Sequence, residues 1–236
     1  MPSLKNWDNR TWLSSKKYIE SFNNFILKHQ KLNKDSKILD IGCGRGKIIE
    51  NLSNKLKLIN KPVGLDIENH KDKSKKIIFK KTDAITFINK TQNTFDLILI
   101  KQTIHLLQIA QITKLLTVCK NKLNPGGKII ILSLDPNNNE IPAFSLMDKK
   151  LKNSLKRDIK IFNLIVKTFN NIIVKRFKFN VKILRKEYVK MIKKRYISTL
   201  LNFNDKQILG GINEINLNYK KELKFKDRLI CLILNK

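Results

Sequence analysis

Hydrophobic positions along the chain follow two alternating patterns. Short, mostly β-branched apolar runs lie at residues 38–41, 63–65, 77–79, 95–100 and 128–132. Before and between them, apolar residues recur at helical spacing over residues 12–29, 47–56, 84–89 and 106–123. Short apolar runs that alternate with helices are typical of buried parallel strands. The pattern predicts an α/β fold with a doubly wound sheet and helices on both of its faces.

The chain after residue 136 has a different pattern. Helical segments of mixed polarity are expected at 144–174, 187–201 and 205–215, with a possible strand at 177–184. The last two apolar runs, 223–225 and 229–234, flank a Lys-Asp pair, which predicts a terminal hairpin. We expect a single domain that consists of an N-terminal helical cap (1–35), a core (36–136), a helical insertion (143–216) and the terminal hairpin (217–236).

Charge separates this chain from an ordinary globular protein. Its 236 residues include 49 Lys and Arg against 19 Asp and Glu, a formal net charge of +30. Such a field attracts nucleic acid, anionic membranes and acidic metabolites. The lysines are nevertheless spread over the whole length, and Lys, Asn and Ile are the residues that AT-rich codons specify. A polyanion-binding role and a background of biased composition both stay open.

Composition also argues against a membrane-spanning, a secreted, a disulfide-rich or a metal-binding protein. No apolar run is long enough to span a bilayer, and the first residues lack the apolar stretch of a secretory signal, so we expect a cytoplasmic protein without membrane insertion. Cys43, Cys119 and Cys231 are odd in number and form no Cys-x-x-Cys motif. Neither a disulfide framework nor a metal site is expected.

Three glycines at alternate positions follow the first predicted strand. Gly42, Gly44 and Gly46 lie in "LDIGCGRG", directly before a predicted helix. Glycine lets the backbone turn tightly and approach a ligand, and the helix N-terminus offers free N–H groups. The spacing is neither that of a phosphate-binding P-loop nor the Gly-x-Gly-x-x-Gly of dinucleotide sites. With Asp40 two residues ahead, it indicates a different nucleotide-like ligand.

This stretch resembles the first motif of the class I S-adenosylmethionine-dependent methyltransferases. Further resemblances follow in the family's order: Asp66 ends the second strand in "VGLDIE", and Asp83 follows the third in "KTDA". "FDLILIKQTIHLL" and "LNPGGKIIIL" resemble the family's fourth and fifth strand segments. The resemblance implies that Asp66 binds the ribose hydroxyls and that Asp83 and Ala84 lie at the adenine. Asp83 is equally typical of a helix start, whereas for Asp40, close before the glycine loop, cofactor binding is favoured over a helix cap.

The same resemblance implies a Rossmann-like seven-stranded mostly parallel sheet with an antiparallel last strand and a helical lid inserted after the fifth strand. It also implies an enzyme with S-adenosyl-L-methionine as its cofactor. The implied cofactor-binding residues are Asp40, Gly42, Cys43, Gly44, Gly46, Asp66, Ile67, Asp83, Ala84 and Lys101.

The acceptor of the methyl group is predicted to lie beyond the fourth strand, because ligands of open α/β sheets bind at the carboxyl ends of the strands. There His105 is a candidate catalytic base and, equally, a histidine packed at a helix start. Arg195 is a candidate for a forked contact with a carboxylate. His105 is also a candidate for binding the acceptor. The other candidates include aromatic side chains of the expected cap and lid, and they are Trp12, Tyr18, Gln102, Tyr188, Arg195 and Tyr196. Trp7 belongs to the same cap.

We therefore expect methyl transfer by in-line displacement to a small anionic metabolite. Two alternatives stay open: an RNA substrate such as tRNA, which the net charge of +30 favours, and a binding module that keeps the fold without turnover. The sequence does not determine the acceptor, the atom methylated or the oligomeric state.

Overall fold

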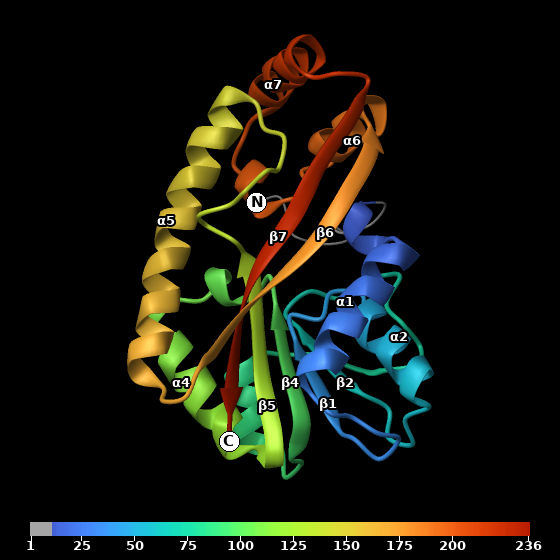
Figure 1. Cartoon of the computed structure of the whole chain (residues 1–236), viewed down its shortest axis with the longest axis vertical. Helices are drawn as coiled ribbons and strands as arrows, with labels where there is room; N and C mark the ends of the chain where they lie inside the picture. The colour runs from blue at the N-terminus through green and yellow to red at the C-terminus, as the bar shows by residue number, and fades with distance from the viewer. Residues whose placement is uncertain (1–10) are drawn as a thin grey trace.

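The computed structural model describes residues 11–236, so Trp7 lies outside the described residues. Its centre is a seven-stranded sheet in the order β3-β2-β1-β4-β5-β7-β6 (Figure 1). The first five strands are parallel, and β7 runs antiparallel between β5 and β6. This confirms the mostly parallel sheet. The strands are β1 (Ile38–Ile41), β2 (Val63–Asp66), β3 (Ile78–Lys81), β4 (Phe95–Lys101), β5 (Leu123–Leu134), β6 (Ile173–Leu184) and β7 (Glu222–Asn235).

Helices cover both faces of the sheet, with α1 and α2 on one side and α4 and α5 on the other (Figure 1). Leu97 and Leu99 of β4 join the core under α1 and α2, whereas Ile98 and Ile100 join the core under α4. Both faces of β4 are thus buried, which explains its unbroken apolar run. The helical elements are η1 (Trp12–Ser14), α1 (Lys16–His29), α2 (Lys47–Leu56), α3 (Ala84–Lys90), η2 (Ile104–Leu106), α4 (Ile109–Asn121), α5 (Ser145–Thr168), α6 (Arg185–Lys193), η3 (Ser198–Leu200) and α7 (Asp205–Asn218). Between residues 11 and 236, no helix is long and apolar enough to cross a membrane.

The predicted terminal hairpin is wrong, because residues 222–235 form the single strand β7. β7 pairs with β6 from Glu222 onward but with β5 only from Leu229 onward. Its first half therefore projects past β5 and forms a two-stranded arm with β6 (Figure 1). The Lys-Asp pair is not a turn: Asp227 takes a buried position of the strand, in alternation with Phe225 and Leu229.

The insertion at 143–216 is not helical throughout, since β6 is the edge strand of the sheet. Helix α5 contributes to both cores: Ile161 and Ile165 pack in the core under α4, whereas Leu151 and Leu155 pack with α6 and α7. Figure 1 shows α6 and α7 at the same end of the molecule, beside the β6–β7 arm. The predicted helix at 187–201 is interrupted at Arg195, whose φ of 51° ends the helical conformation.

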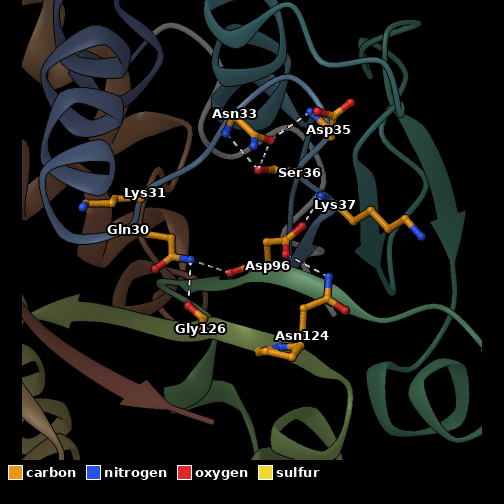
Figure 2. Close-up of a pocket in the computed structure, with 10 residues that line it drawn as sticks. Gln30, Lys31, Asn33, Asp35, Ser36, Lys37, Asp96, Asn124 and Gly126 are labelled. Carbon is orange, nitrogen blue, oxygen red and sulfur yellow. Dashed lines mark hydrogen bonds between the residues drawn. The ribbon is translucent and has the colours of Figure 1, made fainter.

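A polar hollow of about 350 Å³ lies at the amino ends of β1, β4 and β5 (Figure 2). Asp96 accepts hydrogen bonds from the backbone N–H of Lys37, at 2.7 Å, and from the side chain of Asn124, at 2.8 Å. The amide of Gln30 donates to the backbone carbonyls of Asp96 and Gly126. These hydrogen bonds connect the residues of the hollow to one another, and those of Gln30 tie the end of α1 to the sheet. Because ligands of such sheets bind at the carboxyl ends, we assign this hollow a structural role.

Candidate active site

A second cavity, of about 240 Å³, lies at the carboxyl ends of the parallel strands. Residues after β1, β2 and β3 line one half of it, and residues after β4, from α5, from the η3 region and from β7 line the other half. The cavity brings together many of the residues predicted from sequence: Trp12, Gly42, Asp66, Ile67, Asp83, Ala84, Lys101, Gln102, His105 and Tyr196.

Asp66 is held by three groups at the carboxyl end of β2. Its two carboxylate oxygens accept the backbone N–H groups of Gly44 and Glu68, each at 2.9 Å. Nε2 of His70 lies 3.5 Å from the same carboxylate. Burial alone would raise the pKa of Asp66, but the hydrogen bonds from His70, Glu68 and Gly44 outweigh it and hold the pKa below its usual value. Asp66 is therefore ionised at neutral pH and fixed in position.

Two glycines of the loop, Gly42 and Gly46, fit their environment because they carry no side chain. Gly42, Gly44 and Gly46 have φ values of 73°, 54° and 71°. A Cβ atom at Gly42 would lie 2.0 Å from Oγ1 of Thr103, and one at Gly46 would lie 2.2 Å from Ile77. Cys43, Gly44 and Gly46 do not line the cavity. They shape the turn that presents the Gly44 N–H to Asp66.

The other two predicted acids differ in position. Asp40 is 3 % exposed and does not line the cavity, and burial, followed by the charge of Asp66, raises its pKa to about 7 against the opposing effect of Lys101. Asp83 has both of its expected features, since it lines the cavity and its carboxylate caps α3 by accepting the Thr86 N–H at 2.9 Å. Beside Asp66, Ile67 is 67 % exposed although it lines the cavity.

The chain reverses sharply after β4. Gln102 has a φ of 54°, and its N–H bonds to the Leu132 carbonyl at 2.7 Å, so that η2 begins directly above the end of the strand. His105 of η2 lines the cavity, and its buried Nδ1 has no hydrogen-bond partner among the described residues. Burial, followed by the charge of Arg157, lowers the pKa of His105 to about 4. The imidazole is neutral at physiological pH.

Comparison with known proteins agrees with this arrangement. A family model described as a methyltransferase domain matches residues 14–160, which is more than half of the chain. The chain belongs to the methyltransferase-domain family. The methyltransferase thus has the class I fold that the glycine stretch predicted. No curated protein matches its sequence.

Solved structures of low identity share the fold of this methyltransferase. A putative methyltransferase from an antibiotic biosynthesis pathway of Anabaena variabilis is 17 % identical and has a TM-score of 0.65, with 89 % of this chain and 95 % of that one covered. A SAM-dependent methyltransferase from Archaeoglobus fulgidus is 19 % identical, with coverage of 92 % and 94 % and a TM-score of 0.54. The plantazolicin methyltransferase BpumL, solved in complex with SAH, is 18 % identical, with coverage of 98 % and 88 % and a TM-score of 0.55.

The aromatic residues predicted for the acceptor have different roles in the methyltransferase. Trp12 lines the cavity, and its Nε1 donates to Asp227 at 2.9 Å. Tyr196 also lines the cavity and shares a 2.8 Å hydrogen bond with the hydroxyl of Tyr188. Tyr18 and Tyr188 are fully buried core residues outside the cavity lining, and burial raises the pKa of each well above its usual value. They support the wall of the cavity from behind.

Arg195 does not take the predicted position. Its guanidinium lies 2.6 Å from Asp205 and donates to the Phe203 carbonyl at 3.1 Å, and the residue does not line the cavity. The positive φ of Arg195 ends α6 and directs the side chain to α7. Arg195 thus lies outside the cavity lining, away from the position in which a contact with an acceptor carboxylate was predicted.

The methyltransferase also contains cavity residues that sequence reasoning missed. His70 is 2 % exposed in the β2–β3 connection, where no pattern signals it. Asp158 and Asp227 are 7 % and 1 % exposed. Each takes a position that periodicity reserves for an apolar side chain, which is a signal the sequence does contain. Among residues 11–236, no group of His, Cys, Asp and Glu side chains forms a metal site.

Proposed function

We propose that the protein transfers a methyl group from S-adenosylmethionine to a small molecule bound in the cavity. When bound, S-adenosylmethionine supplies an electrophilic methyl group on a positively charged sulfur. Methyl transfer of this kind depends mainly on positioning and on the exclusion of water. The observation that carries the proposal is the fixed, ionised Asp66 beside the glycine loop, at the carboxyl ends of the strands.

The residues of the β1–β3 half fit an adenosyl group. A carboxylate held like that of Asp66 accepts hydrogen bonds from a pair of ribose hydroxyls. Ile67 and Ala84, the residues that follow Asp66 and Asp83 in the chain, also line the cavity, and the 67 % exposure of Ile67 leaves an apolar surface for a flat ring. We infer that these four residues hold the donor and that Gly42 permits its close approach.

The residues of the other half surround the acceptor in this proposal. Trp12 and Tyr196 enclose it and exclude water, and Gln102 and His105 offer polar contacts. We propose that η1 and the α6–η3 segment act as the lid. The hydrogen bond from Trp12 to Asp227 supports this role, since it fixes η1 against the β6–β7 arm.

The cavity suits a small acceptor better than RNA, because Lys101 is the one Lys or Arg side chain that lines it among the described residues. A phosphate backbone needs several such contacts. If tRNA is the substrate instead, its binding will weaken steeply as salt rises. Mass spectrometry of the small-molecule and RNA fractions of a cell extract, after incubation with methyl-labelled donor, separates the two substrates.

Calorimetric titration with S-adenosylhomocysteine tests the donor site. We expect the wild-type protein to bind, and Asp66→Asn to bind at least about tenfold more weakly, because charge-assisted hydrogen bonds to the ribose are lost. Asp35→Asn is the matched control, since Asp35 is exposed and lines the hollow at the opposite end of the sheet. A wild-type protein that releases no heat, or an Asp66→Asn variant that binds like the wild type, contradicts the proposal.

A further inference from the structure

The charge of the cavity is opposite to that of the protein. The chain has 49 Lys and Arg against 19 Asp and Glu, yet within residues 11–236 the cavity is lined by one lysine and by the acids Asp66, Glu68, Asp83, Asp158 and Asp227. Three of these acids belong to the half that we assign to the adenosyl group. Asp158 and Asp227 belong to the other half, where the acceptor binds in the proposed function.

Asp227 already has a structural partner. It accepts the indole N–H of Trp12 at 2.9 Å; burial raises the pKa of Asp227, and the bond from Trp12 and the charge of Lys101 oppose that rise. Asp227 therefore has a structural role, since it holds Trp12 in the wall of the cavity.

Asp158 has no such partner. It is 7 % exposed and lines the cavity, and it has no hydrogen bond among the described residues. Its neighbour Arg157 does not cover it, because that guanidinium donates to the backbone carbonyls of His105 and Leu107. The carboxylate oxygens of Asp158 are not among the fully buried polar atoms that lack a partner, so they are open to the cavity and available to a ligand.

His105 adds a polar group to the same half of the cavity. Its Nδ1 is buried and has no partner among residues 11–236. The clamp by Arg157 ties η2, which carries His105, to α5, which carries Asp158. The carboxylate of Asp158 and the imidazole of His105, each able to accept a hydrogen bond, thus line the acceptor half of the cavity. The side chain of Arg157 holds together α5 and η2, which carry them.

We propose that the methyl acceptor is a primary or secondary amine whose N–H groups bind to Asp158 and His105. This inference rests on the proposed function and names its substrate class. An amine has the charge and the donor groups that a carboxylate and a neutral imidazole require. An anionic acceptor would instead be repelled by Asp158 and Asp227, and Lys101 is the one Lys or Arg that opposes them among the lining residues between 11 and 236.

The chemistry balances with groups already in the cavity. An amine that enters as an ammonium ion gives one proton to Asp158, which passes it to solvent. Burial raises the pKa of Asp158 to about 6, which makes it a better proton acceptor than an ordinary aspartate. The nitrogen lone pair then forms the N–C bond while the bond from the methyl carbon to sulfur breaks, and that electron pair stays on sulfur.

The test compares amines with alcohols and carboxylates of the same carbon skeleton, beginning with benzylamine, benzyl alcohol and benzoate. Ligand-observed NMR in the presence of S-adenosylhomocysteine measures binding without turnover, and methyl-labelled donor measures transfer. We expect the amines of the panel to bind and to take up label in preference to their matched alcohols and acids. Asp158→Asn should weaken amine binding about ten- to hundredfold and leave alcohol binding unchanged.

Asp148→Asn is the matched control, because it is the same change on the same helix at a residue outside the cavity lining. S-adenosylhomocysteine affinity is measured on every variant. If Asp158→Asn loses that affinity, Asp158 binds the donor and the inference is overturned while the proposed function stands. Preference of the wild-type protein for alcohols or acids over every amine also overturns the inference alone. A wild-type protein without affinity for S-adenosylhomocysteine overturns both.

Discussion

The glycine at position 42 gives the sharpest prediction for stability and binding together. Gly42→Ala places a Cβ atom at a φ of 73°, which costs a residue other than glycine about 1–2 kcal/mol. The same atom would lie 2.0 Å from Oγ1 and 2.8 Å from Cβ of Thr103. Overpacking of this kind typically costs a further 1–3 kcal/mol, roughly. We expect the free energy of unfolding to fall by about 2–5 kcal/mol, and the midpoint of thermal unfolding by roughly 4–20 °C.

The clash also affects the cavity. Thr103 donates a 3.0 Å hydrogen bond to the Lys101 carbonyl, so a displaced Thr103 disturbs the end of β4, where Lys101 and Gln102 line the cavity. S-adenosylhomocysteine affinity should fall with stability. Thermal unfolding followed by circular dichroism and a calorimetric titration measure the two effects.

A double-mutant cycle with Thr103→Gly separates strain from steric overlap. Thr103→Gly removes the three atoms nearest to the new Cβ, so the double variant should recover about 1–3 kcal/mol relative to the sum of the single changes. Gly210→Ala is the control, because a Cβ there meets open space on helix α7 and should stabilise by up to about 1 kcal/mol. If Gly42→Ala unfolds and binds like the wild type, the tight approach of the glycine loop to η2 is refuted.

Three further predictions follow from buried or ion-paired groups. Because the pKa of Asp40 rises from 3.8 to about 7 on folding, the ionised carboxylate destabilises the fold increasingly between pH 4 and pH 7. In urea denaturation, the gain in the free energy of unfolding from Asp40→Asn should therefore be larger at pH 8 than at pH 4.5. An equal gain at both pH values would be inconsistent with this cause. Trp12→Phe leaves the buried Asp227 without its 2.9 Å partner and should lower the free energy of unfolding by about 1–3 kcal/mol, whereas an unchanged melting temperature would show that the bond is dispensable. Arg195→Ala should change the KM for the acceptor less than about twofold, because Arg195 forms an ion pair with Asp205 outside the cavity lining and such a pair contributes little to acceptor binding. A large rise in KM would support the predicted contact between Arg195 and an acceptor carboxylate.

Much of the core was predictable because both periodicities are strong there. Residues 38–41 and 47–56 are the observed β1 and α2, since the apolar run and the amphipathic repeat are each bounded by turn residues. The glycine stretch and Asp66 were predictable because a turn that brings backbone N–H groups to a carboxylate requires those residue types. The glycine stretch and Asp66 lie close together because β1 and β2 are parallel neighbours in the sheet.

The acceptor half was less predictable because its residues come from distant elements. Asp158 and Asp227 interrupt apolar stripes on α5 and β7, and the interruption at Asp227 suggested a turn instead of a buried carboxylate. The alternation on both sides of Asp227 was the signal for a continuous strand. The position of Arg195 outside the cavity lining was not predictable, because it depends on a left-handed backbone conformation that a periodic pattern does not show.

A crystal structure of the protein grown with S-adenosylhomocysteine tests the central claim most directly. The account predicts the ribose hydroxyls against the Asp66 carboxylate, the adenine between Ile67 and Ala84, and the sulfur directed toward the half of the cavity that Asp158 lines. A ligand bound elsewhere, or one whose ribose faces away from Asp66, would contradict the account.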